Sequence, residues 1–350
     1  MASGSSLTVG FANQRKSFLA RGRAWVFYAN GQKMVYRTST DGESWSQAID
    51  VRNGSNAGPL FSTWYDGRYI HYAATHTISE TTILYRRGVP ACDGTIDWST
   101  SENIAVSKSG TVNYPMIVVD DTGRPWIGYS YDERPWAARA EYDDGRWGTG
   151  TTWELIRNWT GNWHVSMVPL PGGRIMATPN IVSNHLCMSY FNGNNILYHY
   201  RTDLFPNAYP STVAKGAGSN DVLVVYLSAH KIYLARADVW ESDFVINSLE
   251  MIADSDGIPV VSSDPSTGDL YVFWLTENPA ALHLLKKVAG AWQPSATLWT
   301  AASSEEVLPN SGSEITSFYE AASGHVGVFF VTENTGSSTL RSVFVHTAGR

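Results

Sequence analysis

The 350-residue chain has few charged residues, two cysteines and no long apolar run. Charged residues make up 16% of the sequence, and the formal net charge is −7. We expect no nucleic-acid partner, because binding to a phosphate backbone depends on clustered Lys and Arg, and this chain has no such cluster. No stretch reaches the roughly 18 apolar residues of a membrane helix, so we expect no membrane insertion.

Motifs for metals, phosphates and redox chemistry are also missing. Cys92 and Cys187 fall in different repeats, which favours buried free thiols over a disulfide or a catalytic thiol. There is no His-x-x-x-His or paired-Cys spacing, no phosphate-binding loop and no serine-hydrolase elbow. The sequence therefore predicts neither a metal site nor a cofactor.

The chain does contain one short strand-like segment seven times, at steps of 45 to 57 residues. The copies are Ala24–Asn30, Tyr69–Thr75, Trp126–Asp132, Ile175–Ile181, Val222–Ser228, Leu270–Thr276 and Val326–Thr332. A period of this length without helical segments is typical of a β-propeller. We predict an all-β, single-domain propeller over residues 1–350 with seven four-stranded blades. Six blades are the alternative, because Pro179 interrupts the fourth copy.

The second repeat shows how one blade divides into strands. An inner strand at Pro59–Tyr65 leads through an Asp66-Gly67 turn into the repeated segment, and a third strand follows at Ile83–Arg87. The other inner strands are expected at Ser17–Ala20, Pro115–Asp120, His164–Leu170, Ser211–Gly216, Ile258–Asp264 and Glu314–Glu320. The last repeat lacks a fourth strand, so residues 1–11, with a spare strand at Ser6–Phe11, are expected to complete it and close the ring. We expect a monomer.

One turn carries a family resemblance. The segment Arg37–Ser46 closely resembles the Asp-box turn of sialidase-like propellers, Ser-x-Asp-x-Gly-x-x-Trp, with one residue fewer between Asp41 and Trp45. In such a turn Asp accepts backbone N–H groups, Gly adopts a positive φ and Trp packs against the blade. The resemblance implies a group that includes sialidases, other glycosidases, polysaccharide lyases and lectins; no closer family is identified within it.

Placement in the fold selects the candidate site. Propeller pockets are usually formed by the starts of inner strands and by the turns between second and third strands. The loop Tyr131–Trp136 occupies such a turn and combines acids, a cation and aromatic rings. The catalytic candidates are Tyr131, Asp132, Glu133 and His164. The substrate-binding candidates are Arg15, His76, Arg134, Trp136, Trp163 and Glu277. The alternative is structural: a solvated turn with a surface ion pair, and a packed histidine.

These candidates support two functional hypotheses. The first is a carbohydrate-active enzyme that acts on an oligo- or polysaccharide, possibly acidic, at a central pocket. As a glycosidase it would use two of the carboxylates; as a lyase it would use His164 or Tyr131 as base and Arg134 on a uronate. The second is a non-catalytic lectin or surface interaction module. Sialidase itself is disfavoured, because Arg15-Lys16-Ser17 lacks the proline of the Arg-Ile-Pro-like motif. We expect an extracellular or cell-surface location, although residues 1–10 show no signal-peptide run.

Overall fold

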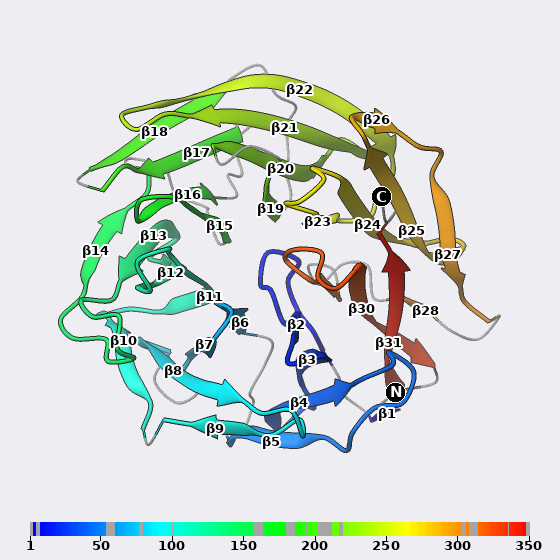
Figure 1. Ribbon diagram of the computed structural model, residues 1–350, viewed down its shortest axis with the longest axis horizontal. Coiled ribbons are helices and arrows are strands. Elements are labelled where there is room, and N and C mark those ends of the chain that lie inside the picture. The colour runs from blue at the N-terminus through cyan, green and yellow to red at the C-terminus, as the bar shows by residue number, and fades with distance from the viewer. Residues whose placement is uncertain are drawn as a thin grey trace.

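The computed structural model of the chain is a ring of seven antiparallel sheets around a central channel (Figure 1). It describes residues 3–4, 8–53, 60–76, 80–99, 101–156, 164–179, 186–193, 195–201, 212–216, 220–302, 306–307, 314–334 and 336–347. All regular elements within these ranges are strands. The described residues contain no helix long and apolar enough to cross a membrane. The predicted seven-bladed propeller is confirmed, and the six-bladed alternative is wrong.

Each blade runs from an inner strand at the channel to an outer strand at the rim. Blade one is β2 (Ser17–Ala20), β3 (Arg23–Ala29), β4 (Lys33–Ser39) and β5 (Ile49–Asn53). Blade two is β6 (Phe61–Tyr65), β7 (Ile70–Thr75), β8 (Thr82–Pro90) and β10 (Asn103–Ser107), and β9 (Ile96–Trp98) also pairs with β8. Blade three is β11 (Val112–Val119), β12 (Pro125–Tyr131), β13 (Arg134–Arg139) and β14 (Thr151–Glu154).

The remaining blades repeat this order with small additions. Blade four is β15 (Val165–Leu170), β16 (Arg174–Pro179), β17 (Leu186–Phe191) and β18 (Ile196–Arg201). Blade five is β19 (Thr212–Lys215), β20 (Asp221–Ser228), β21 (Lys231–Val239) and β22 (Phe244–Asp254). Blade six is β23 (Val260–Ser263), β24 (Leu270–Glu277) and β25 (Ala280–Val288), and both β26 (Ala291–Trp292) and β27 (Ala296–Thr300) pair with β25. Pro179 is the last residue of its strand, where its missing N–H does not interrupt the blade.

Blade seven is completed by the N-terminus. It consists of β29 (Ile315–Ser317), β30 (His325–Asn334), β31 (Ser337–His346) and β1 (Ser3–Gly4), and β28 (Glu306–Val307) also pairs with β30. The closing strand pairs antiparallel with β31, with Ser3 opposite Thr339. Of the strand expected at Ser6–Phe11, residues 6 and 7 lie outside the described residues, and Thr8 forms a bridge with Ala29 of blade one instead of pairing within blade seven. Closure by an N-terminal strand is thus correct, but it uses earlier residues.

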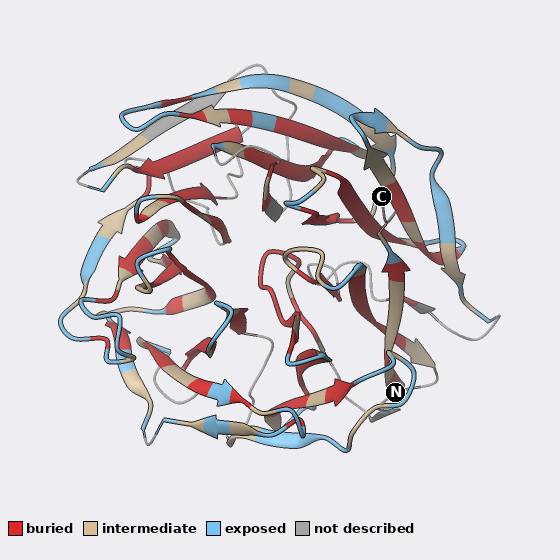
Figure 2. Ribbon diagram, viewed as in Figure 1, coloured by how far each residue is buried: buried red, intermediate tan, exposed pale blue. Residues whose placement is uncertain are grey.

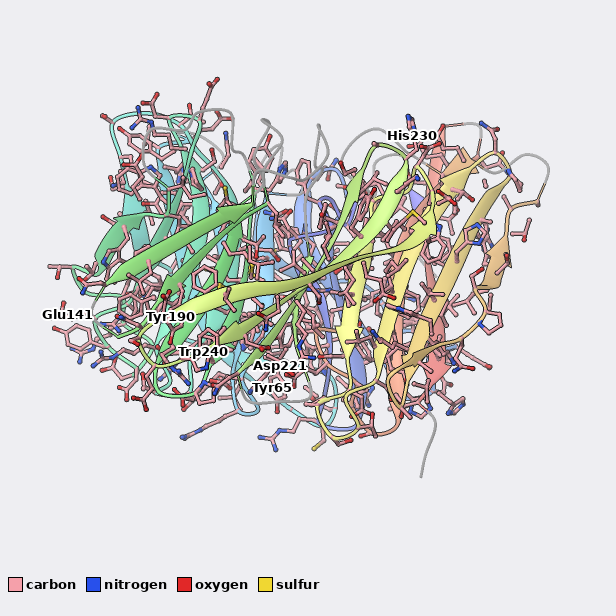
Figure 3. All side chains as sticks on the ribbon, turned by 90° about the horizontal axis from the view of Figure 1, so that it is seen from above. Tyr65, Glu141, Tyr190, Asp221, His230 and Trp240 are labelled. Atoms are coloured by element: carbon pink, nitrogen blue, oxygen red, sulfur yellow. The ribbon has the colours of Figure 1, made fainter. Side chains whose placement is uncertain are left out.

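The ring has two distinct faces. The turns between second and third strands lie on one, called here the upper face, and the turns between inner and second strands lie on the lower face. Figure 3 shows His230, in the turn from β20 to β21, on the upper face and Tyr65, at the end of β6, on the lower face. Any pocket around the axis therefore opens to one face or the other.

The blades pack on one another through buried apolar residues, and the outer strands carry most of the exposed ones (Figure 2). Between blades three and four the contact is close enough to require glycine. A Cβ added to Gly128 of β12 would lie 2.6 Å from Val165 Cγ1 and 3.2 Å from Met167 Sδ, both on β15. Gly128 thus allows the two strands to approach.

We expect Gly128→Ala to lower the free energy of unfolding by about 1–3 kcal/mol, because overpacking forces neighbouring side chains or backbone to shift. Urea denaturation measures this loss. The double variant Gly128→Ala/Val165→Ala should lose less than the sum of the two single variants, since removing the valine methyls relieves the contact. A Gly128→Ala protein as stable as the parent would contradict this account.

The turn from β4 to β5 has the local bonding expected for the segment Arg37–Ser46. Asp41 Oδ1 accepts the backbone N–H groups of Ser44 and Glu43 at 2.7 and 2.8 Å, and these bonds hold the pKa of the Asp41 carboxyl well below its usual range. Gly42 has φ +79°, and the Trp45 ring meets Phe329 of β30 edge-on at 5.5 Å. The turn therefore connects blade one to blade seven, away from the channel.

Candidate functional site

The central channel is filled by the protein's own chain. Residues Thr8–Lys16, called here the channel segment, run through the middle of the ring before β2 (Figure 1). Within it Ala12, Asn13 and Gln14 are fully buried. The Gln14 side chain donates to Pro115 O of blade three at 2.9 Å, and that of Asn13 donates to Val165 O of blade four at 3.3 Å. The segment therefore occupies the interior of the ring between its two faces.

The channel segment also buries charged groups. Glu314, 5% exposed, accepts hydrogen bonds from Thr8 Oγ1 at 2.5 Å and from the backbone N–H groups of Val9 and Gly10 at 2.8 and 3.1 Å. Lys16 Nζ donates to Val9 O at 2.6 Å and lies 4.6 Å from the Phe61 ring centroid. Burial lowers the pKa of Lys16 to about 7. These residues fix the segment rather than present charge to a ligand.

On the upper face, blade three carries a cavity of about 570 Å³, called here the blade-three pocket. Its lining residues are Ser109, Gly110, Thr111, Asn113, Tyr114, Ser130, Tyr131, Asp132 and Glu133. Three of the predicted catalytic residues, Tyr131, Asp132 and Glu133, are thus brought to one cavity. They are accompanied by Asn113 at the start of the inner strand, where sequence reasoning also looks for site residues, and by hydroxyl groups of Ser109, Thr111 and Ser130 that it did not single out.

The backbone around this pocket is strained. Asp132 and Glu133 form the two-residue turn between β12 and β13, with φ +51° and +54°. Tyr114, at the irregular pairing of β11 with β12, has φ +55°. Non-glycine residues in this region cost on the order of 1 kcal/mol or more each, and such strain clusters at functional sites. The equivalent turn of blade five, Ala229-His230, has positive φ as well, so the strain supports a site here only together with the pocket itself.

Aromatic rings and one cation flank the pocket. The Lys108 ammonium lies 5.4 Å from the centroid of the Tyr131 ring and 4.6 Å from that of Trp136. The predicted carboxylate ligand, Arg134, forms an ion pair with Glu154 of β14 at 3.2 Å. The charge of Arg134 is therefore already compensated within its own blade.

His164 lies behind the pocket wall. Its ring is packed between Phe11 of the channel segment and Tyr114, at centroid distances of 4.7 and 4.4 Å, and it is 8% exposed. Neither ring nitrogen has a hydrogen-bond partner among the described residues. Burial lowers the pKa of His164 to about 3, so the ring is neutral at neutral pH. Such a weak base is poorly suited to abstracting a proton.

The other predicted site residues are dispersed. His76 follows β7 in blade two, where its N–H donates to Thr82 O at 2.9 Å. Glu277 is exposed at the end of β24 in blade six, which is not adjacent to blade three. Arg15 is fully buried and contributes to a different cavity at the lower end of the channel. Trp163 lies outside the described residues.

Within the described ranges, no three His, Cys, Asp or Glu side chains are placed to hold a metal ion.

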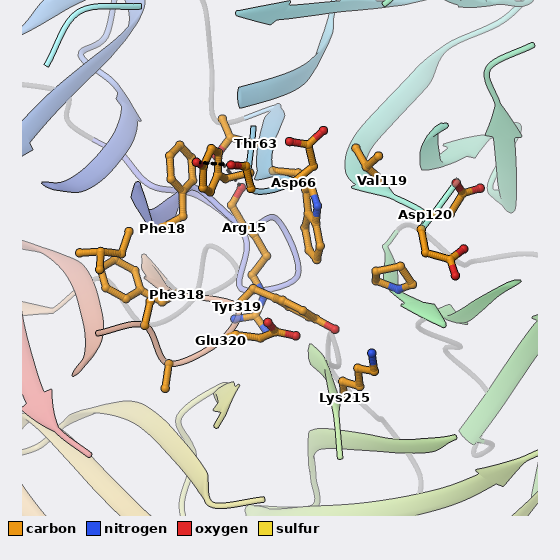
Figure 4. Close-up of a pocket in the computed structure, with 18 of the residues that line it drawn as sticks. Arg15, Phe18, Thr63, Asp66, Val119, Asp120, Lys215, Phe318, Tyr319 and Glu320 are labelled. Carbon is orange, nitrogen blue, oxygen red and sulfur yellow. Dashed lines mark hydrogen bonds between the residues drawn. The ribbon is translucent and has the colours of Figure 1, made fainter. Parts of the chain in front are cut away.

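That lower cavity, called here the axial pocket, measures about 500 Å³ (Figure 4). Its charged lining residues are Arg15, Asp66, Asp120, Asp121, Lys215 and Glu320, and its aromatic ones are Phe18, Trp64, Tyr65, Phe318 and Tyr319. Sequence reasoning missed this pocket, because it was directed to the starts of inner strands and these residues lie at their ends. The available signals were that Arg15, a predicted substrate-binding residue, lies before β2, that Glu320 ends one predicted inner strand, and that Lys215 is the penultimate residue of another.

No family model matches the sequence, and no curated protein matches it. Solved structures do share the fold. AofleA from Arthrobotrys oligospora has 11% identity and a TM-score of 0.57, covering 85% of this chain and 89% of its own. The WD40 domain of Toxoplasma gondii coronin has 10% identity and a TM-score of 0.58, covering 98% and 84%. The Aleuria aurantia lectin, described as a six-bladed β-propeller with a novel fucose recognition mode, has 11% identity and a TM-score of 0.51, covering 83% and 96%. At these identities the likeness shows the fold alone, and the Asp-box resemblance stays a prediction.

Proposed function

We propose that this protein is a carbohydrate-binding propeller that takes one neutral oligo- or polysaccharide segment in the blade-three pocket. The observation that carries the proposal is the convergence of two tyrosine rings, three hydroxyl side chains, an amide and two carboxylates on one cavity with a strained rim. A sugar ring presents C–H groups that pack on aromatic faces, and hydroxyls that need several polar partners at fixed positions. Such a ligand fits an extracellular or cell-surface location.

Propeller neighbours lend support of a second kind. The Aleuria aurantia lectin, which recognises fucose, shares the propeller fold at a TM-score of 0.51. Fold alone does not determine function, so this likeness adds weight only beside the pocket itself. In the present chain the turns between second and third strands differ from blade to blade, for example Tyr131–Arg134 and Glu277–Ala280. That difference favours one site per chain over seven equivalent sites.

The charges favour a neutral glycan over an acidic one. Asp132 and Glu133 both line the pocket, and Arg134 is paired with Glu154. A uronate or sialate would therefore meet like charge there, and like charges placed together select against such a ligand. The acidic glycan considered from the sequence is thus the less suitable ligand for this pocket.

The geometry favours binding over catalysis. Of the two candidate bases of a lyase, His164 is enclosed by Phe11 and Tyr114. For Tyr131, the cation expected to hold the uronate, Arg134, is paired with Glu154. A glycosidase needs two carboxylates that flank the glycosidic bond. Asp132 and Glu133 are consecutive residues of one two-residue turn, so they approach a ligand from the same side. We therefore assign these acids to hydrogen bonding with sugar hydroxyls.

Calorimetric titration with neutral, sialylated and uronic-acid oligosaccharides tests the proposal. We expect one neutral glycan bound per chain, and Tyr131→Ala should weaken binding by about tenfold, or ~1.4 kcal/mol, through loss of ring packing. Tyr142→Ala, which removes an exposed tyrosine that lies outside the pocket lining, is the matched control and should bind as the parent does. Equal affinity for the Tyr131 variant, or several ligands per chain, would count against this site.

The same panel separates binding from turnover. Reducing ends and unsaturated-uronate absorbance are followed together over a long incubation, and we expect no signal in either. Reducing ends that are lost in Glu133→Gln would instead identify a hydrolase. New absorbance would identify a lyase and overturn the assignment of the pocket to neutral glycans.

A further inference from the structure

We propose that the axial pocket is a second binding site, selective for a small zwitterion of the α-amino acid class, whose ammonium binds Glu320 and whose carboxylate binds Lys215. The site lies on the lower face, whereas the blade-three pocket lies on the upper face. It goes beyond the proposed carbohydrate function and does not depend on it.

Two opposite charges meet across this pocket without pairing. Lys215 ends β19 in blade five, and Glu320 follows β29 in blade seven. Figure 4 shows both side chains directed into the same hollow. Neither makes an ion pair or a side-chain hydrogen bond with any residue that the structure describes. Burial raises the pKa of Glu320, although the charge of Lys215 acts in the opposite direction. A half-buried carboxylate and an ammonium that do not reach each other leave room for a ligand that contacts both.

The other acids of the pocket are already engaged. Asp120 accepts from Trp126 Nε1 at 2.8 Å and from three donors of its own turn. Asp66 Oδ2 lies 3.0 Å from His71 Nε2, and its Oδ1 accepts two backbone N–H groups. Asp121 accepts two backbone N–H groups from blade four. Lys215 and Glu320 are thus the charges best placed to determine which ligand binds.

The floor and walls of the pocket supply apolar surface and a fixed cation. The Trp64 and Tyr319 rings meet at a centroid distance of 4.5 Å, and Phe18 stacks on Tyr65 at 5.6 Å. Below them the Arg15 guanidinium donates to Val261 O at 2.7 Å and is buried. About 500 Å³ bounded by rings holds a small organic molecule with its side chain against the aromatic wall.

Charge complementarity decides the ligand class. A purely cationic ligand would pair with Glu320 but place its positive charge near Lys215. A purely anionic ligand would pair with Lys215 but place its negative charge near Glu320. A neutral sugar could form hydrogen bonds with both groups but would neutralise neither charge in a partly desolvated site, which makes it the weaker ligand. A zwitterion compensates both charges at once. A singly charged analogue loses one of these contacts and also leaves the other charge of the pocket beside a like charge. The zwitterion should therefore bind more tightly than either analogue by more than one contact alone would give.

Titration calorimetry on the full chain tests this with glycine, L-phenylalanine, L-phenylalaninamide and N-acetyl-L-phenylalanine. We expect at least one of the two zwitterions to bind with Kd on the order of 1 mM or tighter. The amide, which is only cationic, and the N-acetyl compound, which is only anionic, should bind at least about tenfold more weakly than L-phenylalanine. Failure of both zwitterions to bind at ten times that concentration, or equal binding of the singly charged analogues, would overturn the proposal.

Two variants assign the contacts. Glu320→Gln and Lys215→Met should each weaken zwitterion binding about tenfold, and Glu320→Gln should not weaken binding of the anionic analogue. Glu43→Gln, in the exposed turn of blade one, is the control and should leave binding unchanged. Neutral oligosaccharide binding at the blade-three pocket is measured in parallel and should be unchanged in all three variants, so failure of one site is distinguishable from failure of the other. Zwitterion binding that survives both substitutions would refute the assigned contacts.

Discussion

Glu314→Ala should lower the free energy of unfolding by about 3–4 kcal/mol, among the largest losses expected from one substitution in this chain. The carboxylate accepts hydrogen bonds from the Thr8 hydroxyl and from the N–H groups of Val9 and Gly10 at a site 5% exposed to solvent. Alanine would leave the buried Val9 N–H and the Thr8 hydroxyl proton without this acceptor, whereas the Gly10 N–H keeps Thr8 Oγ1 at 3.0 Å. Each such orphan costs about 1–3 kcal/mol, and hydrogen bonds to a charged acceptor are the stronger kind.

Urea denaturation compares this variant with two others. Glu314→Gln keeps one carbonyl oxygen to accept a backbone N–H, so its loss should be intermediate. Glu43→Ala removes an exposed carboxylate in the outer turn of blade one and should change stability by less than about 0.5 kcal/mol. A Glu314→Ala protein within about 1 kcal/mol of the parent would show that the channel segment contributes little to the stability of the ring.

This prediction matters for function because the channel segment separates the two pockets. It bonds to inner strands on several sides, through Gln14 to blade three, Asn13 to blade four and Arg15 to blade six. A ligand on the upper face therefore contacts blade three and its neighbours rather than the propeller axis. A ligand on the lower face meets the underside of the same segment at Arg15.

Much of the fold could be predicted because each blade repeats a local pattern. The inner strand of blade two ends at Asp66-Gly67 as expected, and Asp66 Oδ1 accepts the N–H groups of Arg68 and Tyr69. The turn is thus set by residues next to each other in the chain. Ser6–Phe11 was misplaced because an alternating apolar pattern does not distinguish a sheet strand from a segment bonded inside a channel. Its partner Glu314 is about 300 residues away.

The candidate site shows the same limit. Tyr131, Asp132 and Glu133 were found because they occupy one hairpin turn, whose position follows from the strand pattern. The enclosure of His164 could not be predicted, because Phe11 reaches it only through the channel segment. Lys215 and Glu320 belong to different blades, and only ring closure places them in one pocket.

The second large effect is a pH dependence of the free energy of unfolding, which arises from the buried side chain of Lys16. Its folded-state pKa is about 7, lowered by burial from 10.5, which an exposed lysine of the unfolded chain should retain. Between these values the unfolded state binds the proton and the folded state does not, so stability should rise with pH at up to about 1.4 kcal/mol per unit. Below about pH 7 both states are protonated, and the full penalty of the buried charge is present.

Lys16→Met isolates this effect, because methionine fills a similar apolar volume and carries no charge. The unfolding free energies of parent and variant are measured at pH 6, 7, 8 and 9. The unfolding free energy of the variant minus that of the parent should stay constant from pH 6 to about pH 7. It should then fall as the pH rises further, because the parent gains stability. The hydrogen bonds from Lys16 Nζ to Val9 O and Gln14 Oε1 are lost in the variant at every pH, so they shift the difference without changing its slope. A difference that stays flat up to pH 9 would mean that Lys16 keeps its proton in the folded protein, and that the channel segment holds a buried ammonium at neutral pH.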